Sequence, residues 1–441
     1  MSTLPQVAKA MQQVLTTTAR ALGRQTGFVQ RESLLDGAAF TQAWVFAVMA
    51  EPMPTWEDVA QSAATGGAPI TAQGIEQRCG EPAAFLLHQV LAASITQLVS
   101  AEPVAIPLLR RFTSVFVDDS STIVLPPVLA DLWSGTGRSG SSPAASLKVQ
   151  VRLDLSRGTL HGPALQHGRS CDSRSPLLKL PIVPGALYLA DLGSWSLARF
   201  ARIGKAGAFW LSRYLPYTVL LTEDGQRWDE VWSLLEAQGQ DVVEMPVRVG
   251  IGKQLPARLL AVRVPRAGAD ERRRRLRKEA RDHGKVVSAY LLALAAWTVV
   301  LTNAPASWLS LREALVLGRA RWQREMLVKL WQSHGHGDET RGKQVWRVLC
   351  EVYAKLLAVL ISHWVMLTEL WEYPERRLTK AAQLIQKHAM HLASSLWSLT
   401  ALEDALNVIR DGLRVCCRMN SRRKRPNTYQ LLLDPDLLIL A

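Results

Sequence analysis

The sequence predicts a mixed α/β protein (α+β class), in which a mixed sheet with a β-rich insertion is flanked by helical segments at both ends. Apolar residues recur every three or four positions in residues 1–110 and again after residue 340, the period of an amphipathic helix. Between these segments, residues 112–213 contain short runs of strand-forming residues. A second β-rich stretch spans residues 217–264.

Size and composition indicate a folded protein of several domains. The chain has 441 residues, of which 48% are hydrophobic, which excludes a disordered tail protein or a collagen-like one. At about 150 residues per domain the length predicts two to four domains. The changes in sequence texture predict boundaries between the segments 1–110, 111–213, 214–296, 297–340 and 341–441.

The positive charge is concentrated in the middle and at the end of the chain. The whole chain has a formal net charge of +14. Residues 1–110 carry a net charge of −2, so residues 111–441 carry +16. A dense Arg block within residues 263–281 includes Arg273 and Arg274, and a second basic run spans residues 418–425. Arg pairs bidentately with phosphate, which favours DNA contacts for the Arg block. The second run fits a solvated tail equally well.

Residues 55–78 resemble a helix-turn-helix element. Thr55 can cap a helix with Asp58 three residues on, Gly66 and Gly67 end it, and Thr71 starts a second helix. This second helix would direct polar side chains outward, namely Gln73, Glu76, Gln77 and Arg78. The pattern favours DNA reading, and two core helices joined by a loop remain the alternative.

The central part of the chain alternates strands with helices. Strands are expected at residues 112–118, 121–126, 146–155, 159–165, 186–191 and 208–213, with a helix at 194–203. The insertion contains a hairpin at 247–264, and a short strand follows at 297–303. Ser310 can cap a long helix at 311–333. Everything after residue 340 is expected to be helical.

Cysteines and apolar stretches predict a reduced, cytoplasmic protein. The five cysteines include no Cys-x-x-Cys pair and no His partner at zinc-ligand spacing. The N-terminus lacks a basic segment followed by a long apolar run, as in a signal peptide. The longest apolar stretch, residues 356–368, is shorter than the roughly 20 residues that a membrane span needs. We therefore expect a buried helix there.

Three carboxylates have the placement of a metal site. Asp119 and Asp191 each end an expected strand, and Glu325 lies on the long helix, with Arg321 four residues before it and Lys329 four after. Gln332 lies a turn further along. Three such carboxylates can hold two Mg²⁺ ions about 4 Å apart for phosphoryl transfer. The alternative is that the aspartates merely begin turns.

The stretch RARWQREMLVKLWQSHG resembles the signature helix of DDE cut-and-paste transposases of the insertion sequence four family. The family pattern is Tyr, two residues, Arg, three residues, Glu, six residues, Lys. Arg321 and Glu325 match it, whereas Gly318 and Gln332 occupy the Tyr and Lys positions. The two departures affect DNA handling rather than metal ligation, and Lys329 could partly compensate for the missing Lys.

Other motifs of the family follow in the same order. DSSTIVLP, from Asp119, resembles the first-aspartate block, with Asp118 as a rival ligand, and LADLG resembles the block around Asp191. WTVVLTNAP resembles the stretch in which family members carry a Trp that stacks on a flipped base. That position is Trp297, although a core residue beginning a strand is the alternative. Arg213 resembles a phosphate-contacting Arg that ends the matching strand.

The resemblance implies an RNase H-like catalytic domain with Asp119, Asp191 and Glu325 as ligands of two Mg²⁺ ions, which Mn²⁺ could replace. It implies a bacterial, nucleoid-associated transposase that binds terminal inverted repeats, cuts them through a hairpin intermediate and joins them to target DNA. Two subunits would hold the two DNA ends together as a homodimer. A catalytically silent DNA-binding relative and a nuclease of the same fold are the alternatives.

Overall fold

The computed structural model describes residues 3–135, 144–318, 339–373, 375–419 and 426–438. The chain divides into two compact units. The first unit comprises Met1–Ala105, Asp119–Leu177 and Gln323–Asn420. The second comprises Ile106–Asp118, Leu178–Trp322 and Ser421–Ala441.

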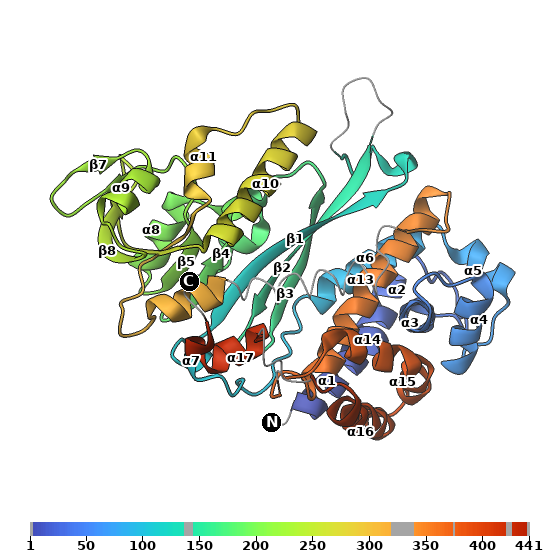
Figure 1. The fold of residues 1–441 in the computed structure, drawn as a ribbon. Coiled ribbons are helices and arrows are strands. Elements are labelled where there is room, and N and C mark those ends of the chain that lie inside the picture. The colour runs from blue at the N-terminus through green and yellow to red at the C-terminus, as the bar shows by residue number, and fades with distance from the viewer. Residues whose placement is uncertain (1–2, 136–143, 319–338, 374, 420–425, 439–441) are drawn as a thin grey trace. The chain divides into compact units, whose positions relative to one another are not determined.

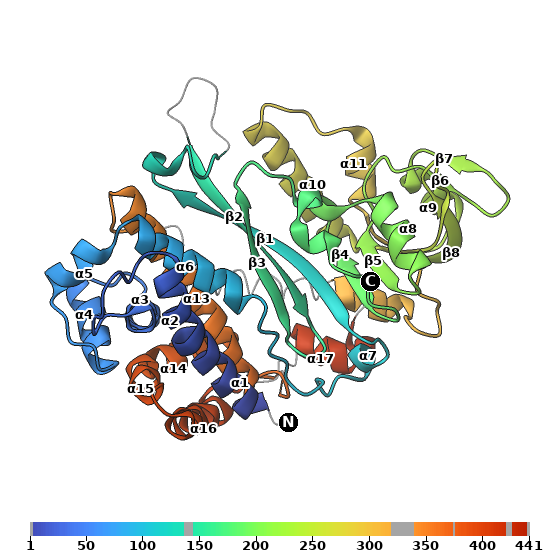
Figure 2. The ribbon, with the colours of Figure 1, turned by 180° about the vertical axis from the view of Figure 1, so that it is seen from behind.

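The first unit is mostly helical and combines helices from both ends of the chain. Figure 1 shows α3 and α6 beside α13, and Figure 2 shows α1 on the same helix from behind. The sequence predicted helical segments at both ends, and here they share one core. The helices of this unit are α1 (Thr3–Gln12), α2 (Ala19–Gln25), α3 (Gly37–Ala50), α4 (Trp56–Thr65), α5 (Ala72–Arg78), α6 (Glu81–Ser94), α13 (Val345–Leu367), α14 (Leu378–Lys387), α15 (Ala389–Ser395) and α16 (Leu399–Cys416).

Helix α13 is the central helix of the first unit. Among the described residues it alone is long and apolar enough to cross a membrane, yet 89% of its most apolar window is buried inside the protein. A helix that is apolar on all sides is stable in water only when neighbours cover it. The buried helix expected at residues 356–368 is therefore confirmed.

The helix-loop-helix expected at residues 55–78 is present. The Thr55 hydroxyl accepts the Asp58 N–H (3.2 Å), and the Asp58 carboxylate accepts the Thr55 N–H (2.7 Å), which forms a capping box. Helix α4 ends at Thr65, before the two glycines. Thr71 caps α5 by accepting the Gly74 N–H (3.1 Å).

A two-stranded hairpin completes the first unit. Strands β2 (Ala145–Asp154) and β3 (Leu160–His167) lie where the sequence predicts strands, and they pair antiparallel. The turn between them contacts α13 through His363, whose Nε2 lies 2.8 Å from the Gly158 carbonyl oxygen. Gly158 has a φ of +70°, and an added Cβ would come within 2.4 Å of Leu367. Only glycine fits this close approach.

The second unit is built on a mixed sheet with the strand order β1-β4-β5-β10-β9-β8-β6-β7. Strands β1, β4 and β5 are parallel, and the pairs from β5 onward are antiparallel. The mixed α/β class is confirmed. The strands are β1 (Val115–Leu125), which ends in the first unit, β4 (Leu187–Ala190), β5 (Phe209–Arg213), β6 (Leu220–Leu221), β7 (Arg227–Trp228), β8 (Val242–Val249), β9 (Leu255–Arg263) and β10 (Trp297–Thr302).

Two local predictions need correction. The hairpin of the insertion is present as β8 and β9, but its first strand begins at Val242 rather than at residue 247. The expected strands 112–118 and 121–126 form the single strand β1. Asp119 therefore lies inside a strand and does not end one. Polar serines after the aspartate suggested a break, but β-branched Thr122 and Ile123 continue the extended backbone.

Helices of the second unit pack against its sheet. Phe200 on α8 stacks on Trp210 of β5, with ring centroids 4.4 Å apart and planes at 7°, and both side chains are fully buried. This stack anchors α8 to the sheet. The helices are α7 (Pro107–Arg110), α8 (Leu197–Lys205), α9 (Val231–Ala237), α10 (Arg266–Asp282), α11 (Ala289–Leu294) and α17 (Thr428–Leu433). Residues 311–318 are also helical.

Candidate active site and DNA-binding residues

Asp191 lies where the sequence predicts it, directly after β4. Its carboxylate accepts the Leu192 N–H (2.7 Å), and it caps the short 3₁₀ turn Leu192–Ser194. The Ser194 hydroxyl donates to the Asp191 carbonyl oxygen (3.1 Å). These bonds hold the carboxylate in one orientation at the carboxyl end of a parallel strand, where sites of α/β sheets gather.

Asp118 and Asp119 differ in their surroundings. The Asp118 carboxylate forms an ion pair with Arg199 of α8 (2.6 Å), and the side chains are only 16% and 10% exposed. The Asp119 carboxylate accepts the Ser120 N–H (2.9 Å) and is partly buried. Neighbouring side chains in a strand point to opposite faces. The Asp118 carboxylate is therefore used in the ion pair with α8, and the Asp119 side chain points to the other face of the strand. This difference favours Asp119 over Asp118 as the metal ligand.

The register of β1 and β4 relates the two aspartates along the chain. In the second unit Val117 pairs with Leu189 in parallel register. Asp119 follows Val117 by two residues, and Asp191 follows Leu189 by two residues. The two aspartates therefore have the same spacing along the sequence from this pair of residues.

The third carboxylate, Glu325, lies outside the described residues, as do Arg321, Lys329 and Gln332. No group of three His, Cys, Asp or Glu side chains suited to a metal occurs in the part of the chain that the structure describes. The described residues therefore do not by themselves form a metal site with three carboxylates.

Residues 311–318, the described part of the helix expected at 311–333, are helical, and their start is capped as predicted. The Ser310 hydroxyl accepts the Glu313 N–H (3.3 Å), and the Glu313 carboxylate accepts the Ser310 N–H (2.8 Å). Burial by itself would raise the pKa of Glu313, but hydrogen bonds from Arg111 and Ser310 hold that pKa below its usual value. Gly318 lies further along, and an added Cβ would meet only Val300 Cγ1 at 3.9 Å among the described atoms.

Trp297 is a core residue in this structure. Its side chain is 3% exposed, the Arg263 guanidinium lies 4.4 Å from its ring centroid, and its Nε1–H donates to Glu236 (3.0 Å). The hydrogen bond from Arg263 holds the pKa of Glu236 below its usual value, so Glu236 accepts as a carboxylate. The ring is not open to a DNA base. The observed geometry matches the alternative of a core residue that begins a strand.

The Arg block divides between two roles on α10. Arg273 donates to the Leu292 carbonyl oxygen (3.0 Å) and to Asp270 (2.8 Å), so its guanidinium is used within the protein. Arg274 is 72% exposed and, in the described part of the chain, forms an ion pair with Glu271 one turn earlier. Every third or fourth side chain of this helix faces the protein, so consecutive arginines cannot all be exposed to solvent. The exposed basic side chains of α10 are Arg266, Arg274, Arg275, Arg277, Lys278 and Arg281.

The polar side chains of α5 also divide into two groups. Gln73 and Gln77 are exposed, as expected of residues that could read DNA. Arg78 points inward instead, since it donates to the carbonyl oxygens of Leu35 (3.3 Å) and Phe28 (3.5 Å) and lies 4.6 Å from the Phe28 ring centroid. The expectation that Arg78 faces outward was wrong, because these carbonyl groups need a donor.

Arg213 ends β5 as predicted and is exposed. Its backbone pairs with Val300 of β10. The strand therefore carries the side chain to the surface of the second unit, at the same end of β5 as Ser212, which pairs with Ala190 directly before Asp191.

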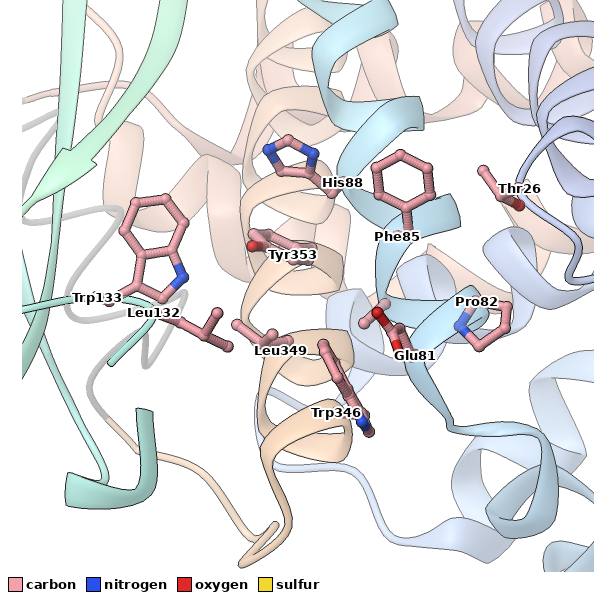
Figure 3. Close-up of a pocket in the computed structure, with 11 residues that line it drawn as sticks. Thr26, Glu81, Pro82, Phe85, His88, Leu132, Trp133, Trp346, Leu349 and Tyr353 are labelled. Carbon is pink, nitrogen blue, oxygen red and sulfur yellow. The ribbon is translucent and has the colours of Figure 1, made fainter. Parts of the chain in front are cut away.

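The first unit contains a cavity of about 630 Å³ that sequence reasoning did not find. Figure 3 shows side chains from α6, α13 and the segment around Trp133 lining it. Burial lowers the pKa of His88, which lies 5.1 Å from the Tyr353 ring, and burial raises the pKa of Tyr353 to about 12. None of the predicted site residues that the structure describes is among the residues that line the cavity.

Comparison with known proteins identifies the class. A family model described as the transposase DDE domain matches residues 110–361, more than half of the chain. The protein belongs to this family of DDE transposases. The family inferred from the signature residues is thereby confirmed.

Relatives agree with this assignment. The chain is 22% identical over 437 residues to the transposase for insertion sequence element IS231F of Bacillus thuringiensis subsp. israelensis, covering 93% of this chain and 91% of the relative. It is 32% identical over 147 residues to the putative transposase InsL for insertion sequence element IS186A of Escherichia coli (strain K12), covering 32% and 40%.

A cryo-EM structure of the piggyBac transposase synaptic complex with hairpin DNA aligns over 95% of this chain and 86% of that chain. The TM-score is 0.45 at 9% sequence identity.

Proposed function

We propose that this DDE transposase binds the terminal inverted repeats of its own mobile element, cuts the DNA at the element ends and joins those ends to target DNA. The observation that carries the proposal is the equal spacing of the two aspartates along the chain from one pair of residues in the parallel strands β1 and β4. Val117 and Leu189 form a parallel pair, Asp119 lies two residues after Val117, and Asp191 lies two residues after Leu189. This spacing supports a role for both aspartates because ligand sites of open α/β sheets lie at the carboxyl ends of parallel strands.

Asp119, Asp191 and Glu325 are the proposed holders of two Mg²⁺ ions, with Mn²⁺ as a substitute. Carboxylates suit these ions because they are hard oxygen ligands. When bound, such ions supply an activated water and stabilise the charge of an in-line phosphoryl displacement. The described geometry fits this role, since the Ser120 N–H orients one carboxylate oxygen of Asp119 and the Leu192 N–H orients one carboxylate oxygen of Asp191.

The cleavage and joining steps follow from phosphoryl chemistry. Water attacks a phosphate at the element end, and the P–O bond to the 3′ oxygen breaks, which leaves a 3′-hydroxyl. That hydroxyl then attacks the opposite strand, so that one phosphodiester bond forms while another breaks and a hairpin closes. After hairpin opening, the same hydroxyl attacks the target DNA. Each of the two attacks by the 3′-hydroxyl forms one phosphodiester bond and breaks another, whereas the first cut and the hairpin opening each consume one water and break one phosphodiester bond.

DNA contacts are proposed for exposed residues of both units. Gln73 and Gln77 on α5 would read base edges, because glutamine amides pair with adenine in the major groove. Arg213 and Arg274 would contact phosphates. In the signature helix, Arg321, Lys329 and Gln332 would hold the DNA end. Two subunits would pair the two element ends, and the protein would act on the bacterial nucleoid in the cytoplasm.

One assay separates this function from its alternatives. The purified full chain is incubated with Mg²⁺ or Mn²⁺ and a duplex that carries the inverted repeat flanking its coding region. Cleavage at the repeat end with a joined product supports transposition. Cleavage without joining indicates a nuclease, and binding alone indicates a catalytically silent relative.

Variants of the carboxylates test the proposed metal ligands in the same assay. Asp119→Ala, Asp191→Ala and Glu325→Ala should each lower cleavage by more than about 100-fold, above the usual effect of losing a partner of a metal ligand. DNA binding should persist. Asp229→Ala is the matched control, because Asp229 is 62% exposed and pairs only with Arg227 in the described contacts. Wild-type cleavage by any of the three variants would remove that residue from the site.

A further inference from the structure

The ion pair between Arg199 and Asp118 links two segments that carry the proposed metal ligands. Arg199 lies in the first turn of α8, where its N–H donates to the capping Ser196 hydroxyl (3.3 Å). Its guanidinium Nη2 lies 2.6 Å from the Asp118 carboxylate, and its centre lies 6.0 Å from the Tyr188 ring centroid. One side chain thus contacts both β1 and β4 within the second unit.

We propose that Arg199 is a positioning residue for metal binding, which acts through Asp118 and the turn after Asp191. The inference rests on the proposed function, because it concerns the same carboxylates. Asp118 directly precedes Asp119, and α8 follows Asp191 after a short connection. Holding Asp118 on the α8 face directs the Asp119 side chain to the opposite face of the strand.

The helix that carries Arg199 is itself held firmly. Phe200, the next residue, is fully buried, stacks on Trp210 at 4.4 Å and meets Trp195 edge-on at 5.1 Å. Trp195 lies between Asp191 and the start of α8. The close packing of Phe200 fixes the helix backbone next to Arg199. The ion pair of Arg199 with Asp118 then fixes the position of β1 relative to this helix.

The ion pair is poorly explained by stability alone. Both side chains are mostly buried, and Arg199 Nη1 is buried with no hydrogen-bond partner among the described atoms. Desolvation offsets most of the attraction in a buried ion pair, so well-packed apolar side chains often stabilise a fold as well. Buried ion pairs are instead suited to specifying one geometry. Here that geometry is the position of β1 at Asp118 relative to the turn at Asp191.

The test compares Arg199→Lys with Arg202→Lys in the full chain. Lysine keeps the charge at position 199 but loses the planar guanidinium, whereas Arg202 lies on the same helix and is exposed. The first readout is Mn²⁺ binding to the DNA-free protein, followed by electron paramagnetic resonance. The second is hydrogen exchange, without metal, at the Ser120 and Leu192 amides that bind the two aspartates.

Arg199→Lys should weaken Mn²⁺ binding by about tenfold or more, within the 10- to 100-fold range for partners of metal ligands, and should speed exchange at both amides. Arg202→Lys should behave as the wild type. If Arg199→Lys does not fold, the double variant Asp118→Leu with Arg199→Met decides, because an apolar pair can restore folding. That double variant should be folded and still bind Mn²⁺ weakly.

Wild-type Mn²⁺ binding by a folded Arg199→Lys or by the double variant would overturn the inference. Asp119→Ala distinguishes this failure from that of the proposed function. If Asp119→Ala abolishes Mn²⁺ binding and cleavage while the Arg199 variants keep both, only the positioning role is lost. If Asp119→Ala itself binds Mn²⁺ and cleaves normally, the proposed metal site is wrong.

Discussion

The Arg263 guanidinium covers one face of the Trp297 ring at 4.4 Å, and both side chains bind the Glu236 carboxylate. The two donors reach different oxygens of Glu236, at 2.9 Å from Arg263 and 3.0 Å from Trp297. This arrangement joins α9, β9 and β10 at one edge of the core. It removes the indole from the surface that a stacked base would need.

Trp297→Phe should therefore affect stability rather than DNA binding. The variant loses a hydrogen bond and some packing, which should lower the free energy of unfolding by about 1–3 kcal/mol. Urea unfolding measures this loss, and fluorescence anisotropy should give a Kd for repeat DNA within about twofold of the wild type. Unchanged stability together with tenfold weaker DNA binding would instead restore the base-stacking role.

The division of the Arg block on α10 predicts different salt dependence for its members. Arg274→Ala and Arg275→Ala remove exposed cations. Each should reduce the slope of log K for DNA against log salt by about 0.9, the value for one lost phosphate contact. Arg227→Ala, which removes an exposed cation on β7, should leave the slope unchanged. Unaltered slopes for both α10 variants would place this helix away from DNA.

Gly318 offers a gain-of-function test of the signature. Since an added Cβ meets only ordinary contact with Val300 at 3.9 Å among the described atoms, Gly318→Tyr should be tolerated. Residue 318 is helical, so replacing its glycine should also stabilise the helix by about a few tenths of a kcal/mol. Gly318→Tyr with Gln332→Lys restores the family pattern and should bind cut repeat ends about 5- to 20-fold more tightly, through one added charge-assisted contact. Gln332→Glu is the opposing control, and equal binding by all variants would contradict the proposed end contact.

His363 predicts a specific loss of stability in acid. Burial lowers its pKa from 6.5 to about 4, although the bond to the Gly158 carbonyl opposes this. The unfolded chain therefore binds a proton between pH 6.5 and 4 that the folded protein does not. Stability is full above pH 6.5 and falls as the pH drops to about 4, by about 3 kcal/mol in total.

His363→Gln can keep a donor to Gly158 and cannot titrate, so it should flatten this part of the stability curve. Urea unfolding at pH 7, 5.5 and 4 measures the difference. His283→Gln, at an exposed position after α10, should retain the wild-type curve. A full acid loss in His363→Gln would show that another group causes it.

Local signals in the sequence predicted much of the fold. The Thr55, Thr71 and Ser310 caps, the hairpin of the insertion and the strand before Asp191 depend on neighbours close in the sequence. The family signature likewise resides in short motifs. Features that depend on distant partners were missed. The inward turn of Arg78, for example, depends on carbonyl groups of Phe28 and Leu35, which lie 50 and 43 residues earlier.

By itself the sequence determined the mixed α/β class, the transposase family and the candidate carboxylates, because periodicity, capping and motif spacing are properties of the chain. The tertiary structure decided which polar and aromatic residues are used internally. It buried Trp297 beneath Arg263, divided the Arg block and committed Asp118 to Arg199. The physical reason is that burial and ion pairing depend on which distant segments meet, and no local pattern records those partners.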